Sequence, residues 1–127
     1  MTRLRVVIAD DHEILRRGVK ALFGNDARWT VCGEAENGQQ AVDVVAALRP
    51  DLVVLDITMP VMNGLQAATK IRQISPETKI IILSMHDSPH IGKEALRAGA
   101  DVFVSKSTAG VSLIRTVEEL FHNRTEP

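Results

Sequence analysis

Apolar, β-branched runs alternate with amphipathic segments along the whole chain. The runs that predict strands cover residues 4–9, 29–35, 52–55, 79–83 and 102–104. The central runs are almost wholly apolar, which is typical of strands that are covered on both faces. Strands that alternate with helical segments indicate βα units. We therefore predict an α/β fold: a doubly wound, five-stranded parallel sheet with helices on both faces.

Apolar residues recur at helical spacing between these runs. The predicted helical faces are Ile14, Leu15, Val19 and Leu22, then Ala41, Val42, Val45 and Leu48, then Leu65, Ala68 and Ile71, and finally Leu113, Ile114, Val117, Leu120 and Phe121. A fourth helix, over residues 89–98, has only Ile91, Ala95 and Leu96 as apolar anchors before Gly99 ends it. We expect this helix to be the least firmly held.

Polar residues stand where four of the predicted strands end. Asp10 and Asp11 follow the first strand, Asp56 the third, Ser84 the fourth and Lys106 the fifth. In an open parallel sheet, ligands bind beyond the carboxyl ends of the strands, at the point where the strand order reverses. For the order 2-1-3-4-5 that point lies between the first and third strands, which carry the aspartates. These five residues are therefore predicted to form one site.

Three converging carboxylates favour a bound cation, because they otherwise repel one another and raise their own pKa values. Mg²⁺ prefers oxygen ligands in octahedral geometry and keeps several waters. We expect Asp11 and Asp56 to be direct ligands and Asp10 to hold a coordinated water. The backbone carbonyl of Thr58 would complete the protein's share of the ligands.

A lysine and a hydroxyl opposite the metal indicate a phosphoryl site, since a simple Mg²⁺ site needs neither Lys106 nor Ser84. Phosphoryl transfer depends on positioning and on neutralising charge over the oxygens of the transferred group. A carboxylate can then act as the nucleophile and form an acyl phosphate. Asp56 is the candidate nucleophile because it follows a central strand.

Four ordered motifs, ADDH at residues 9–12, LDITMPVMNG at 55–64, ILSMH at 82–86 and GADVFVSK at 99–106, span the chain. In these motifs the chain resembles the receiver domain of a two-component response regulator. The resemblance implies a flavodoxin-like receiver fold with strand order 2-1-3-4-5, in which the histidine of a sensor kinase supplies the phosphoryl group to Asp56.

The resemblance also implies a role for each of the other site residues. Asp10 and Asp11 would serve Mg²⁺, Ser84 and Lys106 would hold the phosphoryl oxygens, and Phe103 would be the aromatic switch residue. Phosphorylation would then alter the surface of the fourth helix, fifth strand and fifth helix. We expect no enzyme acting on other substrates, only a module that catalyses its own phosphorylation and dephosphorylation.

Residues 33–38 and 83–87 resemble more narrowly the branch whose receivers precede a LuxR-type helix-turn-helix output domain. This implies transcription regulation, with DNA contacted only through an output domain that is absent from the chain, and a homodimer formed on phosphorylation. Two departures from the family pattern stand out. Ser107 follows the lysine where many receivers have proline, and Ser84 replaces the commoner threonine.

Other functions fit the residues less well. An aspartyl phosphatase resembling the haloacid dehalogenase family would carry a general acid two residues after its nucleophile, where this chain has Thr58. A constitutive adaptor would not need all five site residues. A flavodoxin-like cofactor binder would need a loop rich in Ser, Thr and Gly after the first strand.

Single residues also have simpler explanations. Asp10 and Asp11 could cap the first helix, Ser84 could cap a helix, and Lys106 could be a solvated charge. His86 and His90 lack a third zinc ligand, and we expect His86 to line the mouth of the site instead. We expect His12 and His122 on solvated faces, and Phe103 either in the core or as a switch.

Composition limits the function further. The 127 residues, 45% of them apolar, suffice for one domain, predicted over residues 1–122, with a polar tail or the start of a linker at 123–127. A net charge of −1 gives no electrostatic footprint for nucleic acid. The lone cysteine, Cys32, is expected to be a small buried side chain. With no membrane-length apolar run or signal-peptide pattern, we expect a soluble, cytoplasmic protein.

Overall fold

A five-stranded parallel sheet forms the centre of the protein. The computed structural model describes residues 3–85 and 89–121. The strands are β1 (Leu4–Ala9), β2 (Trp29–Ala35), β3 (Leu52–Asp56), β4 (Lys79–Ser84) and β5 (Val102–Ser105), and they lie in the order β2-β1-β3-β4-β5. The predicted sheet and its order are confirmed.

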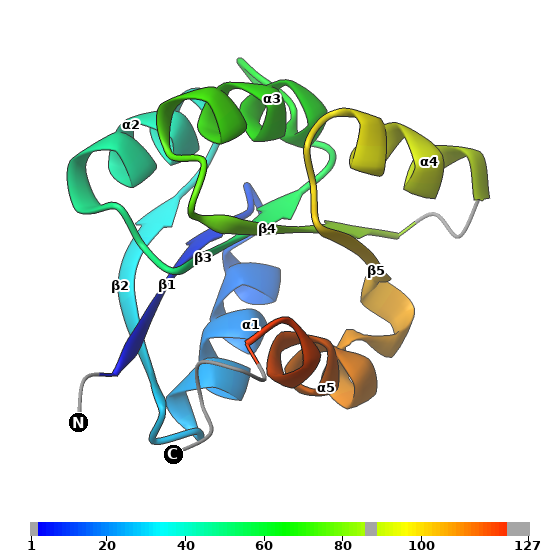
Figure 1. Cartoon of the computed structure of the whole chain (residues 1–127). Coiled ribbons are helices and arrows are strands. Elements are labelled where there is room, and N and C mark those ends of the chain that lie inside the picture. The colour runs from blue at the N-terminus through cyan, green and yellow to red at the C-terminus, as the bar shows by residue number, and fades with distance from the viewer. Residues whose placement is uncertain (1–2, 86–88, 122–127) are drawn as a thin grey trace.

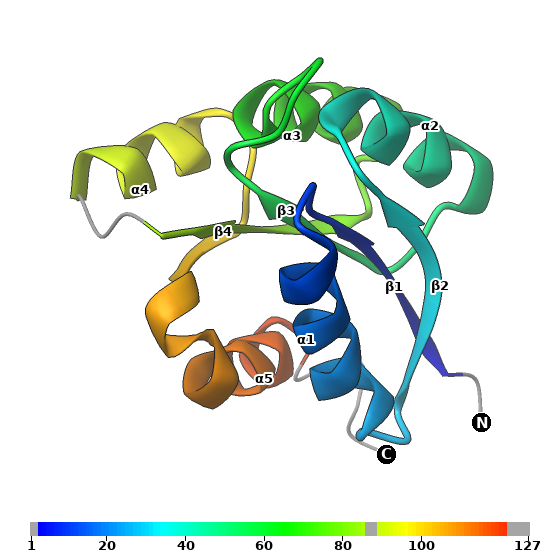
Figure 2. The ribbon, with the colours of Figure 1, turned by 180° about the vertical axis from the view of Figure 1, so that it is seen from behind.

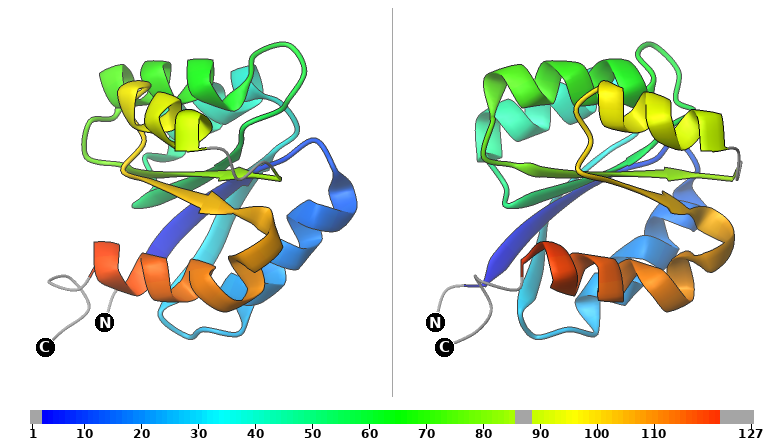
Figure 3. Two further views of the ribbon diagram at one scale, coloured as in Figure 1. Left: turned by 90° about the vertical axis from the view of Figure 1, so that its right-hand side faces the viewer. Right: turned by 45° about the vertical axis from the view of Figure 1, so that its right-hand side comes forward.

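Helices cover both faces of this sheet (Figures 1 and 3). They are α1 (Glu13–Gly24), α2 (Gly38–Leu48), α3 (Gly64–Ile74), α4 (Pro89–Arg97) and α5 (Ala109–Leu120). One core cluster joins α2, α3 and α4 to one face of the sheet, and a second joins α1 and α5 to the other. Alternate strand residues serve the two clusters, Val7 the first and Val6 and Ile8 the second. The sheet is therefore buried on both sides, as its apolar strands require.

Strands β3, β4 and β5 each run one residue beyond the predicted end. The added residues are polar, but their backbones still pair: Asp56 lies opposite Leu83, and Ser84 lies opposite Ser105. Because ladder hydrogen bonds come from the backbone, a polar side chain does not by itself end a strand. Asp56 and Ser84 are consequently held by the sheet rather than by a loop.

Three expected helical anchors face solvent instead of the core. Ile14 and Leu15 on α1 are 83% and 40% exposed, and Leu96 on α4 is 55% exposed, whereas Val19 and Ala95 are buried. Helical spacing identifies a face but does not fix where a short helix meets the sheet. The expected contribution of Ile14, Leu15 and Leu96 to the core is therefore wrong.

Gly64 allows the loop after β3 to return close to the site. Its N–H donates to the carbonyl of Ile57 at 3.0 Å, and a Cβ at this position would collide with the backbone oxygen of Asp56. The next helix, α3, begins with a capping box in which Asn63 accepts from the Gln66 N–H at 2.9 Å. The Asn-Gly pair thus turns the chain sharply behind Asp56 and starts a helix.

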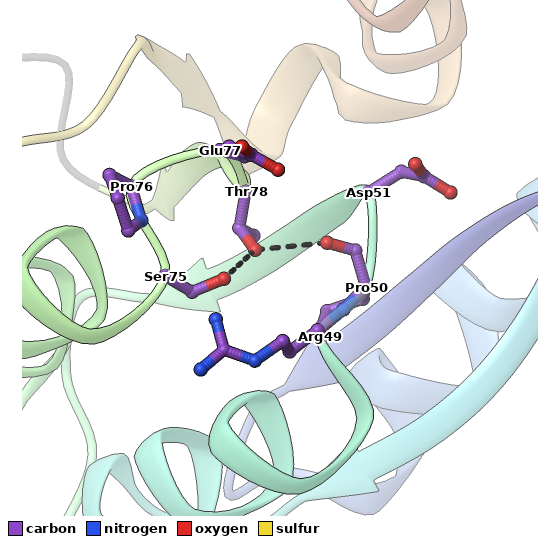
Figure 4. Close-up of a pocket in the computed structure, with 7 residues that line it drawn as sticks. All are labelled: Arg49, Pro50, Asp51, Ser75, Pro76, Glu77 and Thr78. Atoms are coloured by element: carbon purple, nitrogen blue, oxygen red, sulfur yellow. Dashed lines mark hydrogen bonds between the residues drawn. The ribbon is translucent and has the colours of Figure 1, made fainter.

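A pocket of about 270 Å³ lies at the opposite end of the sheet from Asp56. Figure 4 shows its buried hydroxyls: Thr78 Oγ1 donates to the Pro50 carbonyl at 2.9 Å and lies 2.7 Å from Ser75 Oγ. These bonds join the turns that precede β3 and β4. Since these hydroxyls are satisfied within the protein, their hydrogen bonds stabilise the fold at this end of the sheet.

Cys32, expected to be a small buried side chain, is partly buried and packs against the first core cluster. Across residues 3–85 and 89–121, none of the helices combines the length and apolar character needed to cross a membrane.

Candidate functional site

The carboxyl edge of the sheet brings together residues from three strand ends. Asp10 follows β1, Asp56 is the last residue of β3 and Lys106 follows β5. Strands β1 and β3 are neighbours, with Ala9 opposite Leu55. Asp10 and Asp56 therefore lie at the ends of adjacent strands, at the point where the strand order reverses. Figure 2 shows this edge from behind, with the end of β1 leading into α1.

Lys106 bridges the two aspartates. Its Nζ lies 3.0 Å from Asp10 Oδ2 and 3.1 Å from Asp56 Oδ1. All three side chains are almost fully buried, with exposed fractions of 8% for Lys106, 3% for Asp10 and 5% for Asp56. The lysine is therefore a buried counter-ion for two carboxylates, and the alternative of a solvated surface charge is excluded by its burial.

The turn after β1 adds two further groups. Asp11 is more exposed than Asp10, and the oxygen or nitrogen atoms of Asp10, Asp11, His12 and Asp56 all lie within 4.8 Å of one another. His12 is 63% exposed, as expected, but its Nδ1 lies 3.1 Å from Asp11 Oδ1. The sequence interpretation missed this contact, although His12 directly follows the aspartate pair. His12 is also the N-cap residue of α1, so neither aspartate caps that helix.

Burial raises the pKa of the Asp56 carboxyl above its ordinary value. Repulsion from Asp10 raises it further, whereas Lys106 and the Thr58 N–H, 3.4 Å from Asp56 Oδ1, lower it. The ionised carboxylate is thus disfavoured by the folded protein even with a lysine beside it. An added cation would relieve the repulsion between the carboxylates.

This pKa shift predicts that Asp56→Asn stabilises the fold at neutral pH. A carboxyl whose folded pKa is raised favours folding most below its unfolded pKa, and that contribution is lost as pH rises through the folded pKa. The neutral amide avoids this loss, and Lys106 keeps Asp10 as a partner. Thermal unfolding in the absence of Mg²⁺ should show a melting temperature higher than that of the wild type by a few degrees, on the order of a 1 kcal/mol effect.

The same measurement at about pH 4 should show a smaller difference between the two proteins, because the wild-type carboxyl is then partly protonated. A less stable Asn variant at neutral pH, or a difference that grows on acidification, would contradict the assigned direction.

Residues after Asp56 shape the mouth of the site. Ile57 N–H donates to the Leu83 carbonyl at 3.0 Å, so the loop begins pinned to β4. Val61, at the exposed tip, has φ of 69°, a left-handed conformation that is uncommon for a β-branched residue. The role of the Thr58 carbonyl as a metal ligand stays a prediction.

Ser84 lies on β4 and Phe103 on β5, and their roles in switching stay predictions. Ser84 is fully buried at the end of β4, one residue beyond the partner of Asp56 in the sheet. Phe103 is partly buried on β5 and packs against the cluster beneath α4. A Cβ added to Gly92 of α4 would lie 3.6 Å from the Phe103 ring, so α4 leaves room beside that ring.

Ser107 makes a local bond that proline could not make. Its N–H donates to Ser105 Oγ at 3.3 Å, and its own hydroxyl lies 2.8 Å from the same atom. The chain then forms a short 3-10 turn, Lys106–Thr108, which leads into α5. The serine therefore helps to fix the turn that carries Lys106.

The histidines outside the aspartate cluster have different outcomes. The expectations for His86 and His122 concern residues outside the described ranges. His90 lies on α4 with its Nε2 3.1 Å from Glu94 Oε1, on an exposed helix face. Within the described ranges, the one cluster suited to a metal is that of Asp10, Asp11, His12 and Asp56.

An apolar groove of about 260 Å³ opens beside the site, between α1 and α5. It is lined by Ile14, Leu15 and neighbouring residues of α1, by Leu83 and by Gly110, and it reaches Asp10 and Lys106. The groove thus runs from the exposed apolar residues of α1 to the buried Asp10 and Lys106.

Comparison with known proteins identifies the family. Residues 6–118 match the Response regulator receiver domain. This chain belongs to that family. The transcriptional regulatory protein YdfI of Bacillus subtilis is 37% identical over 114 residues, which are 90% of this chain and 53% of YdfI. The receiver domain thus spans about half the length of the curated relatives it matches.

Solved structures agree with this assignment. The signal receiver domain of NarL from Mycobacterium tuberculosis has a TM-score of 0.89 and 33% identity, over 94% of this chain and 97% of that one. A CheX–CheY–BeF3–Mg²⁺ complex from Borrelia burgdorferi gives a TM-score of 0.87 and 25% identity, over 93% of this chain and 89% of the matched chain. The predicted receiver family, its fold and its regulator branch are confirmed.

Proposed function

We propose that this receiver domain accepts a phosphoryl group on Asp56 from a sensor histidine kinase. The observation that carries the proposal is the buried Asp56 carboxylate, bridged by Lys106 to Asp10 at the strand-order reversal. A carboxylate oxygen of Asp56 would form the new bond to phosphorus while the bond between phosphorus and the kinase histidine breaks. The kinase imidazole then leaves and takes a proton from solvent.

The cluster of donors fits Mg²⁺. Three carboxylates supply hard oxygen ligands, and burial and repulsion from Asp10 raise the pKa of Asp56, so a further positive charge would stabilise its ionised form. Mg²⁺ favours such oxygens and binds one or two carboxylates together with waters and phosphate oxygens. We propose that Asp10, Asp11, Asp56 and the Thr58 carbonyl hold it. When bound, Mg²⁺ neutralises charge on the oxygens of the transferred group.

Lys106 would supply the second cation of the reaction. Its ammonium already contacts Asp56 Oδ1, so it can pair with a phosphoryl oxygen after a small movement. The buried Ser84 hydroxyl would donate to another oxygen. Phosphorylation adds about −1.5 to −2 charges at this position. The movement of Ser84 and Lys106 would then change the packing of Phe103 and the face formed by α4, β5 and α5.

Labelling separates this function from its rivals. The chain is incubated with Mg²⁺ and acetyl phosphate, and any added phosphoryl group is located by intact mass and peptide mapping. We expect one group, on Asp56, and none after chelation of Mg²⁺. Multiple turnover of unrelated phosphomonoesters would instead indicate the phosphatase, and a chain that never labels would indicate the adaptor.

We propose further that the α1–α5 groove receives the helix that carries the kinase histidine. Ile14 is 83% exposed on its rim, and the groove leads to Asp10 and Lys106. Ile14→Ser should lower the rate of transfer from a histidine kinase that phosphorylates the wild-type chain by about tenfold, equivalent to one lost apolar contact. Labelling by acetyl phosphate, which needs no docking, should be unchanged.

Leu96→Ser is the matched control, because Leu96 is an exposed leucine on α4, outside the groove lining. It should leave transfer from the kinase intact. Equal losses with both phosphodonors for Ile14→Ser, or an equal loss for Leu96→Ser, would exclude the groove as the docking surface.

The whole protein would be a transcription regulator, since relatives such as YdfI are transcriptional regulatory proteins in which the matched region is about half of the length. Contact with DNA would come through an output domain, and phosphorylation would favour a homodimer. The predicted domain end at residue 122 and the tail or linker at 123–127 lie outside the described residues. A cytoplasmic location stays a prediction.

A further inference from the structure

We propose that Arg16 is a positioning residue that orients the Asp10–Asp11 turn for Mg²⁺. The inference rests on the proposed function, because it concerns the metal-binding step of that same site. Arg16 lies on α1, outside the group of carboxylates, and none of the sequence motifs singled it out. Arg16 would affect Mg²⁺ binding by holding the backbone of Asp10 and Asp11, and it would not contact the metal.

The guanidinium of Arg16 is largely buried and makes two directed hydrogen bonds. Nη1 donates to the Asp10 carbonyl at 2.6 Å, and Nε donates to Glu34 Oε1 at 2.9 Å. The side chain is only 11% exposed, unlike that of its neighbour Arg17, which is 72% exposed. A planar guanidinium held at two of its nitrogens has little freedom to rotate, so the donor to Asp10 is fixed in direction.

Glu34, on the neighbouring strand β2, holds Arg16 in place. Its other oxygen, Oε2, accepts from Lys20 Nζ at 2.8 Å. The hydrogen bond from Lys20, and secondarily that from Arg16, lowers the pKa of the Glu34 carboxyl, so this side chain is ionised at neutral pH. Two cations of α1 are thus tied to one anion of β2, and the helix is fixed beside the end of β1.

The Asp10 carbonyl belongs to the peptide plane that also carries the Asp11 N–H. Arg16 holds one side of that plane, and the Asp10 N–H, which donates to the Ala35 carbonyl at 3.0 Å, fixes the preceding peptide. The direction in which Asp11 leaves the chain follows from this plane. The Asp11 side chain is 31% exposed, and among the ion pairs of the described residues it contacts only His12. Its orientation therefore depends on the backbone that Arg16 holds.

Arg16→Met tests the proposal, with Arg17→Met as its matched control. Arg17 stands on the same helix and pairs only with the exposed Glu13, 2.7 Å away, among the ion pairs of the described residues. Mg²⁺ binding is measured by calorimetry without any phosphodonor, and thermal unfolding is measured alongside. We expect Arg16→Met to raise the Mg²⁺ dissociation constant by about tenfold, as loss of an outer-shell partner does, and Arg17→Met to leave it unchanged.

Two further measurements separate positioning from general damage. At saturating Mg²⁺ the rate of labelling of Arg16→Met by acetyl phosphate should return close to that of the wild type, because only metal binding is weakened. Glu34→Gln, which leaves the Arg16–Asp10 bond possible but less firmly held, should raise the dissociation constant in the same direction by a smaller factor.

Equal Mg²⁺ affinity of Arg16→Met and Arg17→Met would overturn the inference while leaving the proposed function intact. So would a labelling defect of Arg16→Met that persists at saturating Mg²⁺. A wild-type chain that binds no Mg²⁺ would instead overturn the metal site of the proposed function itself.

Discussion

Asp56→Asn is expected to abolish Mg²⁺-dependent labelling by acetyl phosphate. The amide is close in shape to the carboxyl but has no anionic oxygen to attack phosphorus. Asp10 is a poorer nucleophile, because Lys106 contacts its Oδ2 and the His12 N–H donates to its Oδ1 at 2.9 Å. The contacts of Asp56 with Lys106 and with the Thr58 N–H, by contrast, both fall on Oδ1. Asp11 stands on the exposed turn, and among the ion pairs of the described residues it pairs with His12 and not with the lysine. Intact mass should show no added phosphoryl group over the time in which the wild type labels fully.

Asp43→Asn provides the control, since Asp43 is an exposed aspartate on α2. It should label like the wild type. Labelling of Asp56→Asn at the wild-type rate would show that another residue is the acceptor. The melting temperature is measured for the same samples, and the expected higher stability of Asp56→Asn excludes unfolding as the reason for its lost labelling.

The sequence predicted the sheet well because runs of apolar residues are what strands buried on both faces require. A strand segment buried on both faces must be apolar, and β3 from Leu52 to Leu55 and β4 from Ile80 to Leu83 are. The same logic found Asp56 and Lys106, because a charged residue at the end of such a strand is conspicuous. Their mutual contact does not follow from the strand order alone, because β4 lies between β3 and β5 and the lysine side chain reaches across.

Groups on helices were harder to predict. Arg16 stands beside Arg17 on α1, and nothing in their spacing says that one is 11% and the other 72% exposed. Ile14 was assigned to the core for the same reason. The rotation of α1 on the sheet decides both, and that rotation depends on partners distant in sequence, such as Glu34. Helical periodicity shows which residues of a helix share a face, but it does not show which face packs on the sheet.

Lys106→Met is expected to have the second large effect, because it leaves two buried carboxylates without their counter-ion. Removing one partner from a buried ion pair costs about 3–5 kcal/mol of folding stability. Asp10 and Asp56, with exposed side-chain fractions of 3% and 5%, would then face each other without neutralisation. Asp56→Asn is different, since it leaves one lysine with one aspartate. We therefore expect opposite signs: the lysine variant is less stable at neutral pH and the asparagine variant more stable.

The pH dependence and the metal distinguish this cause from simple loss of packing. Lysine lowers the pKa of Asp56, so its removal raises that pKa further. Stability of Lys106→Met should consequently recover as pH falls and the Asp56 carboxyl takes up a proton, and it should rise more on addition of Mg²⁺ than that of the wild type. Chemical denaturation at two pH values, with and without Mg²⁺, measures both effects.

Phosphoryl transfer should suffer separately from stability. Loss of one preorganised donor to a developing charge slows a reaction by roughly 100- to 1000-fold, so labelling of folded Lys106→Met at saturating Mg²⁺ should fall by about that factor. Lys70→Met, at an exposed lysine of α3, should match the wild type in both stability and labelling. Labelling of Lys106→Met within a fewfold of the wild type would show that the lysine balances the carboxylates in the resting site but takes no part in the transfer.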